Sequence, residues 1–270
     1  MSKDQFVIAC VESPESAAIV LPWARHFAER LRHKSLMALY VDDGRSPVAN
    51  DDRWLKELDV PYVSMRGDWR TAIEGLPTAF NGILAVAAVD TTAPHRSLTH
   101  PKTLLHEFKN CKIAYLVVSG ANFHCSTINI QLSTALTMTH RREGKEKLVW
   151  ASYLARFLGS QLTLAHPDYR DGDLRMRWRN NMRFVDKMFT PLNINYANRI
   201  LTTKHSTLNP DLAALDELQP DLLVARTTDT RERDLIDWFL PLPEYRLLTH
   251  PSHTPLLFLN PRDDLYILCD

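Results

Sequence analysis

Acidic and hydroxyl side chains follow directly after three apolar runs in the N-terminal half, where they could bind a cation or a small polar molecule. The residues concerned are Glu12, Ser13, Asp42, Asp90 and Thr91. Carboxylate oxygens are the usual ligands of hard cations, and hydroxyl groups both donate and accept hydrogen bonds. The same residue types are common in loops and at helix N-termini, so we favour loop polarity and helix capping over a ligand cleft.

A matching pair of residues lies in the C-terminal half. Asp229 and Thr230 follow the apolar run Leu222–Ala225, as the earlier Asp-Thr pair follows its own apolar run. Arg231 and Arg233 come next and could bind an anion. Exposed loops mix charges at little energetic cost, so a solvated loop is the interpretation that we favour here as well.

The sequence lacks the residue patterns of several well-defined active sites. It holds 11 histidines and 4 cysteines, but no His-Glu-x-x-His segment and no Cys-x-x-Cys pair. A Gly-x-Ser-x-Gly nucleophile segment and a Gly-x-x-x-x-Gly-Lys-Ser/Thr phosphate loop are also missing from it. We therefore predict no catalytic residues, no metal and no cofactor. A nucleotide-using enzyme stays open as an alternative to a protein that is not an enzyme.

The elements that would position these residues occur twice. The segment Trp23–Leu31 has the pattern Trp-Ala-x-x-Phe-Ala-x-x-Leu, and Trp150–Leu158 returns it as Trp-Ala-x-x-Leu-Ala-x-x-Leu. Each copy leads into an apolar run, Leu36–Val41 or Leu162–Ala165. Two copies of one helix-to-strand unit predict two similar domains in tandem.

Strand-like and helix-like segments alternate along the whole chain. The predicted strands are Phe6–Cys10, Leu36–Val41, Tyr62–Met65, Ile83–Val89, Ile113–Val118, Ile128–Leu132, Leu162–Ala165, Ile194–Leu201, Asp221–Ala225 and Leu256–Leu259. The predicted helices are Pro14–Arg32, Asp52–Leu58, Trp69–Leu76, Lys102–Asn110, Lys145–Leu158, Asp173–Phe189, Pro210–Leu218 and Arg233–Leu248. This order predicts the α/β class, with two tandem doubly wound, Rossmann-like domains over 1–122 and 123–270. Each has a five-stranded, mainly parallel sheet, and such a sheet binds ligands at the carboxyl ends of its strands.

The composition of the chain limits the classes of partner that it is expected to bind. The chain has 270 residues, 32 Lys+Arg and 32 Asp+Glu, so no overall field attracts nucleic acid or an anionic membrane surface. The N-terminal residues lack the pattern of a signal peptide, and no apolar stretch reaches the length of a membrane span. Together with the scattered cysteines, these features predict a cytoplasmic protein with no nucleic-acid or membrane partner.

Two further segments suggest contacts with other proteins. Arg175, Arg179 and Arg183 recur every four residues, which fits either a basic stripe for an acidic partner or, as we favour, the solvent face of an amphipathic helix. The C-terminal tail carries the apolar run Leu265–Cys269. We expect this run to pack on its own domain, with exchange into a partner subunit as the alternative.

The ordered motifs of the chain resemble those of the universal stress protein family in its tandem two-domain form. The segments that carry the resemblance are Cys10–Ser16 with Trp23-Ala24, the Gly67-Asp68 turn, Pro220–Val224 and the closing segment His250–Phe258. The resemblance covers most of both halves. It implies a stress-response protein whose terminal strands, Ile113–Val118 and Leu256–Leu259, pair edge to edge in an intramolecular pseudo-dimer. A further homodimer is a possibility that it leaves open.

The departures from the family pattern concern ATP. ATP-binding members place an Asp at the end of strand one, where this chain has Glu12. They also carry a Gly-x-x-Gly-x9-Gly-Ser/Thr segment after strand four, whereas 88–96 and 227–234 contain no glycine. Glycines let main-chain N–H groups approach phosphate oxygens, so we predict that neither half holds ATP.

The resulting functional prediction is a stress-response binding or scaffold protein with an unknown protein partner. The alternative is a sensor that binds a small polar ligand or a nucleotide in a degenerate cleft at the strand ends. In either case the cleft residues would be those named above, in both halves of the chain.

Overall fold

The structure is a computed structural model that describes residues 4–31, 34–44, 53–120, 132–140, 144–203, 206–228 and 242–261. The predicted domain boundary after residue 122 and the apolar tail Leu265–Cys269 lie outside these ranges. All structural statements below refer to the described residues.

Strands and helices alternate in both halves, as the sequence predicts. The first half contains β1 (Phe6–Cys10), α1 (Pro14–Arg30), β2 (Ser35–Asp42), the 3-10 helix η1 (Arg53–Glu57), β3 (Tyr62–Arg66), α2 (Trp69–Glu74), α3 (Leu76–Ala79), β4 (Gly82–Val89), α4 (Pro101–Glu107), η2 (Phe108–Asn110) and β5 (Ala114–Ser119). The second half contains β6 (Ser133–Thr137), α5 (Gly144–Phe157), β7 (Gln161–Pro167), α6 (Gly172–Phe189), η5 (Thr190–Leu192), β8 (Tyr196–Leu201), α7 (Pro210–Leu218), β9 (Leu222–Arg226), α8 (Pro243–Leu248) and β10 (Leu256–Leu259).

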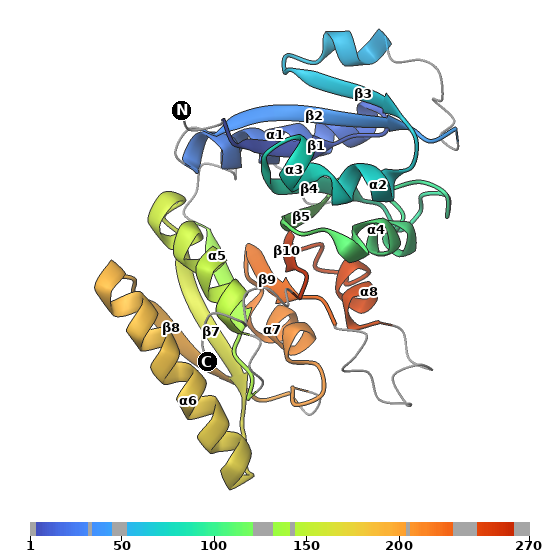
Figure 1. Ribbon diagram of the computed structural model, residues 1–270. Coiled ribbons are helices and arrows are strands. Elements are labelled where there is room, and N and C mark those ends of the chain that lie inside the picture. Colours follow the sequence, from blue (N-terminus) through green and yellow to red (C-terminus); the bar gives the residue numbers. More distant parts are fainter. Residues whose placement is uncertain are drawn as a thin grey trace.

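The strands form one 10-stranded sheet in the order β3-β2-β1-β4-β5-β10-β9-β6-β7-β8. Every neighbouring pair is parallel except β5 and β10, which pair antiparallel in the middle of the sheet (Figure 1). The predicted edge-to-edge pairing of the two terminal strands is therefore present within the chain. The two five-stranded parallel halves share one backbone hydrogen-bond ladder.

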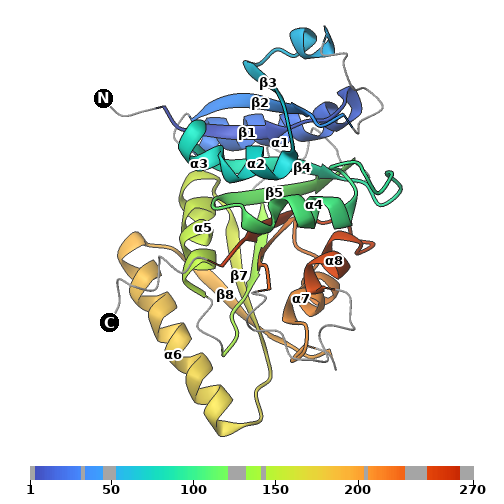
Figure 2. The ribbon, with the colours of Figure 1, turned by 45° about the vertical axis from the view of Figure 1, so that its right-hand side comes forward.

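Helices cover both faces of the sheet, and alternate strand residues point to opposite faces. In β1, Val7 and Ala9 pack toward α1, whereas Ile8 and Cys10 pack toward α2. In the second half, α5 and α6 lie over the same face as α1, while α7 and α8 lie over the face that α2 and α4 cover (Figure 2). The result is a three-layer arrangement in which most sheet residues are fully buried.

Helix α1 begins where the sequence predicts. Ser13 has extended backbone dihedrals, and its side chain accepts a hydrogen bond from the Ser16 N–H at 3.2 Å. The Ser16 hydroxyl in turn accepts the Ser13 N–H at 3.0 Å, which completes a capping box, and Pro14 occupies the first helical position. These contacts set the direction in which the chain leaves β1, and so they position Glu12.

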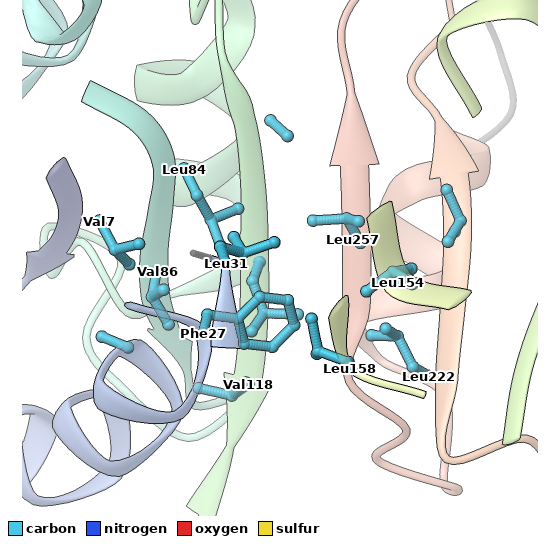
Figure 3. Close-up of a cluster of buried hydrophobic side chains, with 14 of the residues drawn as sticks. Val7, Phe27, Leu31, Leu84, Val86, Val118, Leu154, Leu158, Leu222 and Leu257 are labelled. Carbon is cyan, nitrogen blue, oxygen red and sulfur yellow. The ribbon is translucent and has the colours of Figure 1, made fainter. Parts of the chain in front are cut away.

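Aromatic rings and aliphatic side chains fill the joint between the halves. Phe258 of β10 stacks on Tyr115 of β5 with ring centroids 5.4 Å apart, and Tyr115 contacts Phe108 at 4.7 Å. On the other face, Figure 3 shows Phe27 and Leu31 opposite side chains from the end of α5. The joint thus has a continuous apolar core on both sides of the sheet.

Two predicted elements lie partly outside the described residues, and a third differs from the structure. Strand β6, Ser133–Thr137, lies between two parallel strands and was not predicted, while residues 128–131 of the predicted strand Ile128–Leu132 lie outside the described part of the chain. The described part of the predicted helix Arg233–Leu248 is α8, Pro243–Leu248, in which Pro243 occupies the first turn, where proline is tolerated; residues 233–241 lie outside the described ranges. The predicted helix at 52–58 is a single 3-10 segment.

Candidate functional site

The carboxylate of Glu12 lies at the end of β1 and closes the loop between β4 and α4. It accepts the backbone N–H of Leu98 at 2.7 Å and that of Thr99 at 3.4 Å. It also accepts hydrogen bonds from the hydroxyl groups of Ser97 and Thr99, the latter at 3.1 Å. One carboxylate therefore takes up two main-chain donors and two hydroxyl donors at the end of this loop.

The other predicted cleft residues of the first half have local structural partners. Ser13 caps α1, as described above. Asp42 accepts the Gly44 N–H at 3.2 Å and lies 3.8 Å from the guanidinium of Arg66. Asp90 accepts the N–H and hydroxyl of Thr92 at 2.8 and 2.7 Å, which is an Asx-type turn. Thr91 is exposed next to it.

Loop polarity and helix capping account for these contacts. Glu12 and Asp90 are linked through one loop, since the Asp90 N–H donates to the Thr99 carbonyl at 2.9 Å. Asp42 belongs instead to the turn that follows β2.

A second internal carboxylate closes a loop in the C-terminal half. Glu244, in the first turn of α8, is 3% exposed and accepts the backbone N–H of Thr228 just after β9. Both halves thus direct a carboxylate of their own at the loop that follows their fourth strand. The predicted residues Asp229 and Thr230, with Arg231 and Arg233, lie outside the described part of the chain.

Sequence reasoning missed a buried ion pair at the end of β6. Lys147 of α5 is 5% exposed, and its ammonium group lies 3.7 Å from Asp211 of α7. The same ammonium donates to the Thr137 carbonyl at 3.3 Å, and the Thr137 hydroxyl lies 2.5 Å from Asp211. Buried charges persist when paired and hydrogen-bonded, so this cluster ties two helices to the strand between them.

A third carboxylate, Glu217 of α7, holds the turn after β8. It accepts the N–H of Thr202 at 2.9 Å and that of Thr203 at 2.8 Å, and both hydroxyl groups also donate to it. Burial acts to raise the pKa of Glu217, but the four donors outweigh it and lower the pKa to about 2. The negative form is therefore the one that the folded state stabilises.

The Glu217 contacts predict a pH dependence of stability. A lowered pKa in the folded state contributes stability above the unfolded value of 4.5, and this contribution disappears as the pH falls from 4.5 toward 2. We expect Glu217→Gln to lower the free energy of unfolding at pH 7 by less than about 1 kcal/mol, since the side chain is exposed. The difference from wild type should vanish near pH 2 in urea titrations. The exposed Glu57→Gln should show no such trend, and a gap that widens at low pH would contradict the assignment.

The arginine stripe lies on the exposed side of α6. Arg175 donates to the Tyr169 carbonyl at 3.0 Å, and Arg183 lies 3.4 Å from the Asn180 side-chain oxygen. Among the α6 residues, Val185 and Phe189 are buried, so the helix is amphipathic as predicted. The preferred interpretation of a solvent face fits these contacts.

Cys10 and Cys111 are the two thiols in the described part of the chain, and both are buried. Burial raises the pKa of Cys111 to about 12 and that of Cys10 still further, so both stay protonated and unreactive at neutral pH. Within the described ranges there is no group of three or more His, Cys, Asp or Glu side chains that could hold a metal ion. No helix there is long and apolar enough to cross a membrane.

Ser97 and Thr99 were not predicted as part of the strand-end region. They lie 85 and 87 residues from Glu12 in sequence, and no local pattern connects them to it. The available signal was the density of hydroxyl residues in 91–103, within a loop that has no glycine.

Solved structures with the same fold come from several kinds of protein. A universal stress protein from Archaeoglobus fulgidus DSM 4304 superposes with a TM-score of 0.64 at 9% identity, over 96% of this chain and 99% of that one. A protein assigned as a universal stress protein from Pseudomonas aeruginosa UCBPP-PA14 gives 0.57 at 14% identity, over 98% and 95%. The cytoplasmic domain of a prokaryotic cation chloride cotransporter gives 0.55 at 12% identity, over 95% of each chain.

These likenesses extend over the whole chain, so they include both halves and the joint. The sequence matches no protein-family model and no curated protein. The likeness therefore concerns the fold, in which an α/β unit with a mainly parallel sheet occurs twice. This chain has the tandem fold of the universal stress proteins.

Proposed function

We propose that this chain is a stress-response protein of the universal stress protein kind that acts as a binding or scaffold protein and does not hold ATP at its strand ends. The whole-chain likeness to two universal stress proteins supports the stress-response role. The contacts of the two internal carboxylates support the absence of ATP binding. We place the protein in the cytoplasm and propose that its role involves no catalysis.

The observation that carries the proposal is the position of the Glu12 carboxylate. It already accepts two main-chain donors of the loop after β4, the N–H groups of Leu98 and Thr99, which are then not free to bind a phosphate group. Hydrogen bonds to a charged group contribute about 1.5–3 kcal/mol each, so displacing the carboxylate is costly. A phosphate placed beside it would also be repelled by about 4 kcal/mol per charge pair at 4 Å, at an effective dielectric constant near 20.

The corresponding loop of the second half offers no better site. Glu244 takes the Thr228 N–H, and its other carboxyl oxygen is buried without a hydrogen-bond partner among the described residues. A buried negative charge at this place opposes a second anion. The same contacts count against the alternative of a sensor that holds a nucleotide in either cleft.

Thermal unfolding with ATP and Mg²⁺ tests the proposal. A ligand at 100 times its Kd adds roughly 2.7 kcal/mol to the stability of the folded state. We expect ATP and AMP, with and without Mg²⁺, to leave the melting temperature unchanged up to millimolar concentration. A saturable rise with ATP that is lost when the loop contacts of Glu12 and Glu244 are altered would show that phosphates bind at the strand ends, and the proposal would fail.

The partners that we propose are proteins, and a homodimer is one of them. Neutral net charge gives weak repulsion between copies, and nucleic acid is not favoured. Cross-linking in cells, followed by identification of the linked chains, distinguishes a second copy from another protein. Recovery of the chain on nucleic acid at physiological salt would contradict this assignment.

A further inference from the structure

A cavity of about 590 Å³ lies between the two halves, and one side of it borders the start of the loop after β9, where Thr227 donates to Leu259 and Asn260 of the cavity lining. Its floor consists of the starts of β4 and β5, where Gly82 and Ile83 lie beside Ile113, together with the end of β10 at Leu259. Leu31, at the end of α1, closes one side of it. Its volume falls in the range of small-molecule sites, which are about 300–1,000 Å³.

One face of α5 forms the opposite wall. Val149, Trp150, Tyr153 and Phe157 recur at helical spacing and all line the cavity. Val149 and Tyr153 are each 40% exposed, which is unusual for large apolar side chains beside a core. The wall from Glu146 to Phe157 is about 16 Å long at 1.5 Å per residue, which suits an elongated apolar molecule.

The charged residues are distributed unevenly along this cavity. Lys34, Lys112 and Arg156 line it, and Glu146 is the acidic residue that lines it. Lys34 donates to Gln5 at 2.6 Å, and the Arg156 guanidinium lies 5.3 Å from the centre of the Phe157 ring. Arg156 and Glu146 are ten residues apart on α5, so the cation and the acid mark opposite ends of the aromatic wall.

The carboxyl group of Glu146 is buried, and neither oxygen has a hydrogen-bond partner among the described residues. The repeat that pairs Trp23 with Trp150 places Glu146 where the first half has Ile19. The end of the Ile19 side chain reaches to within 3.0 Å of the position that a Cβ atom on Gly120 would occupy. Apolar packing at that point of the first half is thus replaced by an acid in the second.

We propose that this interhalf cavity binds a free amphipathic organic anion, with an apolar body along the aromatic wall and the anionic group at the Arg156 end. The aromatic and aliphatic lining removes the body from water, which is the main source of affinity for such a ligand. The lining carries three cations, Lys34, Lys112 and Arg156, against one acid, Glu146, and this excess of positive charge favours an anionic group. A cationic ligand of the same shape would be repelled by these three side chains, and the Glu146 carboxyl group, which could attract it, is buried.

Calorimetric titration of the full chain with three matched ten-carbon probes tests the proposal. The probes are decanoate, decan-1-ol and decylamine, each below the concentration at which it self-associates. We expect one decanoate per chain, with decylamine at least tenfold weaker. Equal or tighter binding of decylamine, or no saturable binding of decanoate, would overturn the proposal. One decanoate per two chains would also overturn it, because a second copy would then complete the site.

Two pairs of variants distinguish the contribution of the anionic group to the affinity from that of the apolar body. Arg156→Glu should weaken decanoate about tenfold, or about 1.4 kcal/mol, and leave decan-1-ol unchanged. Arg179→Glu, a matched exposed arginine on α6, should change neither. Val149→Trp should fill the cavity and weaken decanoate and decan-1-ol alike by tenfold or more, whereas Met176→Trp on α6 should weaken neither. Unchanged decanoate binding by both cavity variants would place the ligand elsewhere on the molecule.

Discussion

Replacement of Phe258 by alanine is expected to lower the free energy of unfolding by about 3–5 kcal/mol, the largest effect of any change considered for this chain. Phe258 is fully buried in β10 and stacks on Tyr115 of the neighbouring antiparallel strand. Its removal leaves a cavity at the joint, where the surrounding backbone is held on both sides by strand hydrogen bonds. The cost therefore includes lost burial and a void that cannot collapse fully.

Urea unfolding followed by circular dichroism measures this effect. Met176→Ala on α6 serves as the control, because Met176 is 58% exposed and should change stability by less than about 0.5 kcal/mol. The wild-type protein should unfold in one transition, since a single sheet and an apolar cluster on each of its faces extend through both halves. A Phe258 variant as stable as wild type would mean that the joint contributes little.

Replacement of Glu12 by alanine is expected to lower the free energy of unfolding by about 1–3 kcal/mol. The change removes one acceptor from several donors at once, among them the Leu98 and Thr99 N–H groups. Donors that lose their partner in a partly buried loop are costly, because water replaces the acceptor only in part. Glu12→Gln should cost less, since the amide oxygen still accepts from part of the loop.

Hydrogen exchange gives this prediction a local measurement. In Glu12→Ala the amides of Leu98 and Thr99 should exchange faster than in wild type, while amides in the centre of β7 should keep their protection. Glu57→Ala, an exposed change in η1, should alter neither set. If Leu98 and Thr99 exchange at the wild-type rate in Glu12→Ala, the carboxylate does not hold the loop and the argument against phosphate binding loses its main support.

The fold could be predicted because its strands are strongly apolar and its helices have clear caps. The structure has Pro210–Leu218 and Leu256–Leu259 at the bounds predicted from the sequence. Ser133–Thr137 was missed because two of its residues, Thr134 and Thr137, are polar although they are nearly inaccessible. Lys147 donates to the Thr137 hydroxyl, whereas the Thr134 hydroxyl has no hydrogen-bond partner among the described residues.

The strand-end region was harder to predict than the fold. The types of its residues indicated capping and turns, and the contacts of Ser13 and Asp90 agree with that interpretation. The partners of Glu12 could not be predicted, because they come from a loop that tertiary structure alone brings beside β1. The cavity between the halves also escaped prediction, since no local pattern shows which faces of two distant helices stay apart.

The antiparallel pairing of β5 and β10 determines where the loops of the two halves lie relative to each other. The two halves run in opposite senses across it, so the loops after β4 and after β9 emerge on opposite rims of the molecule. A single small molecule cannot touch both rims at once. A molecule bound at one rim would leave the other rim accessible, and the length of the strands sets the distance between the two rims.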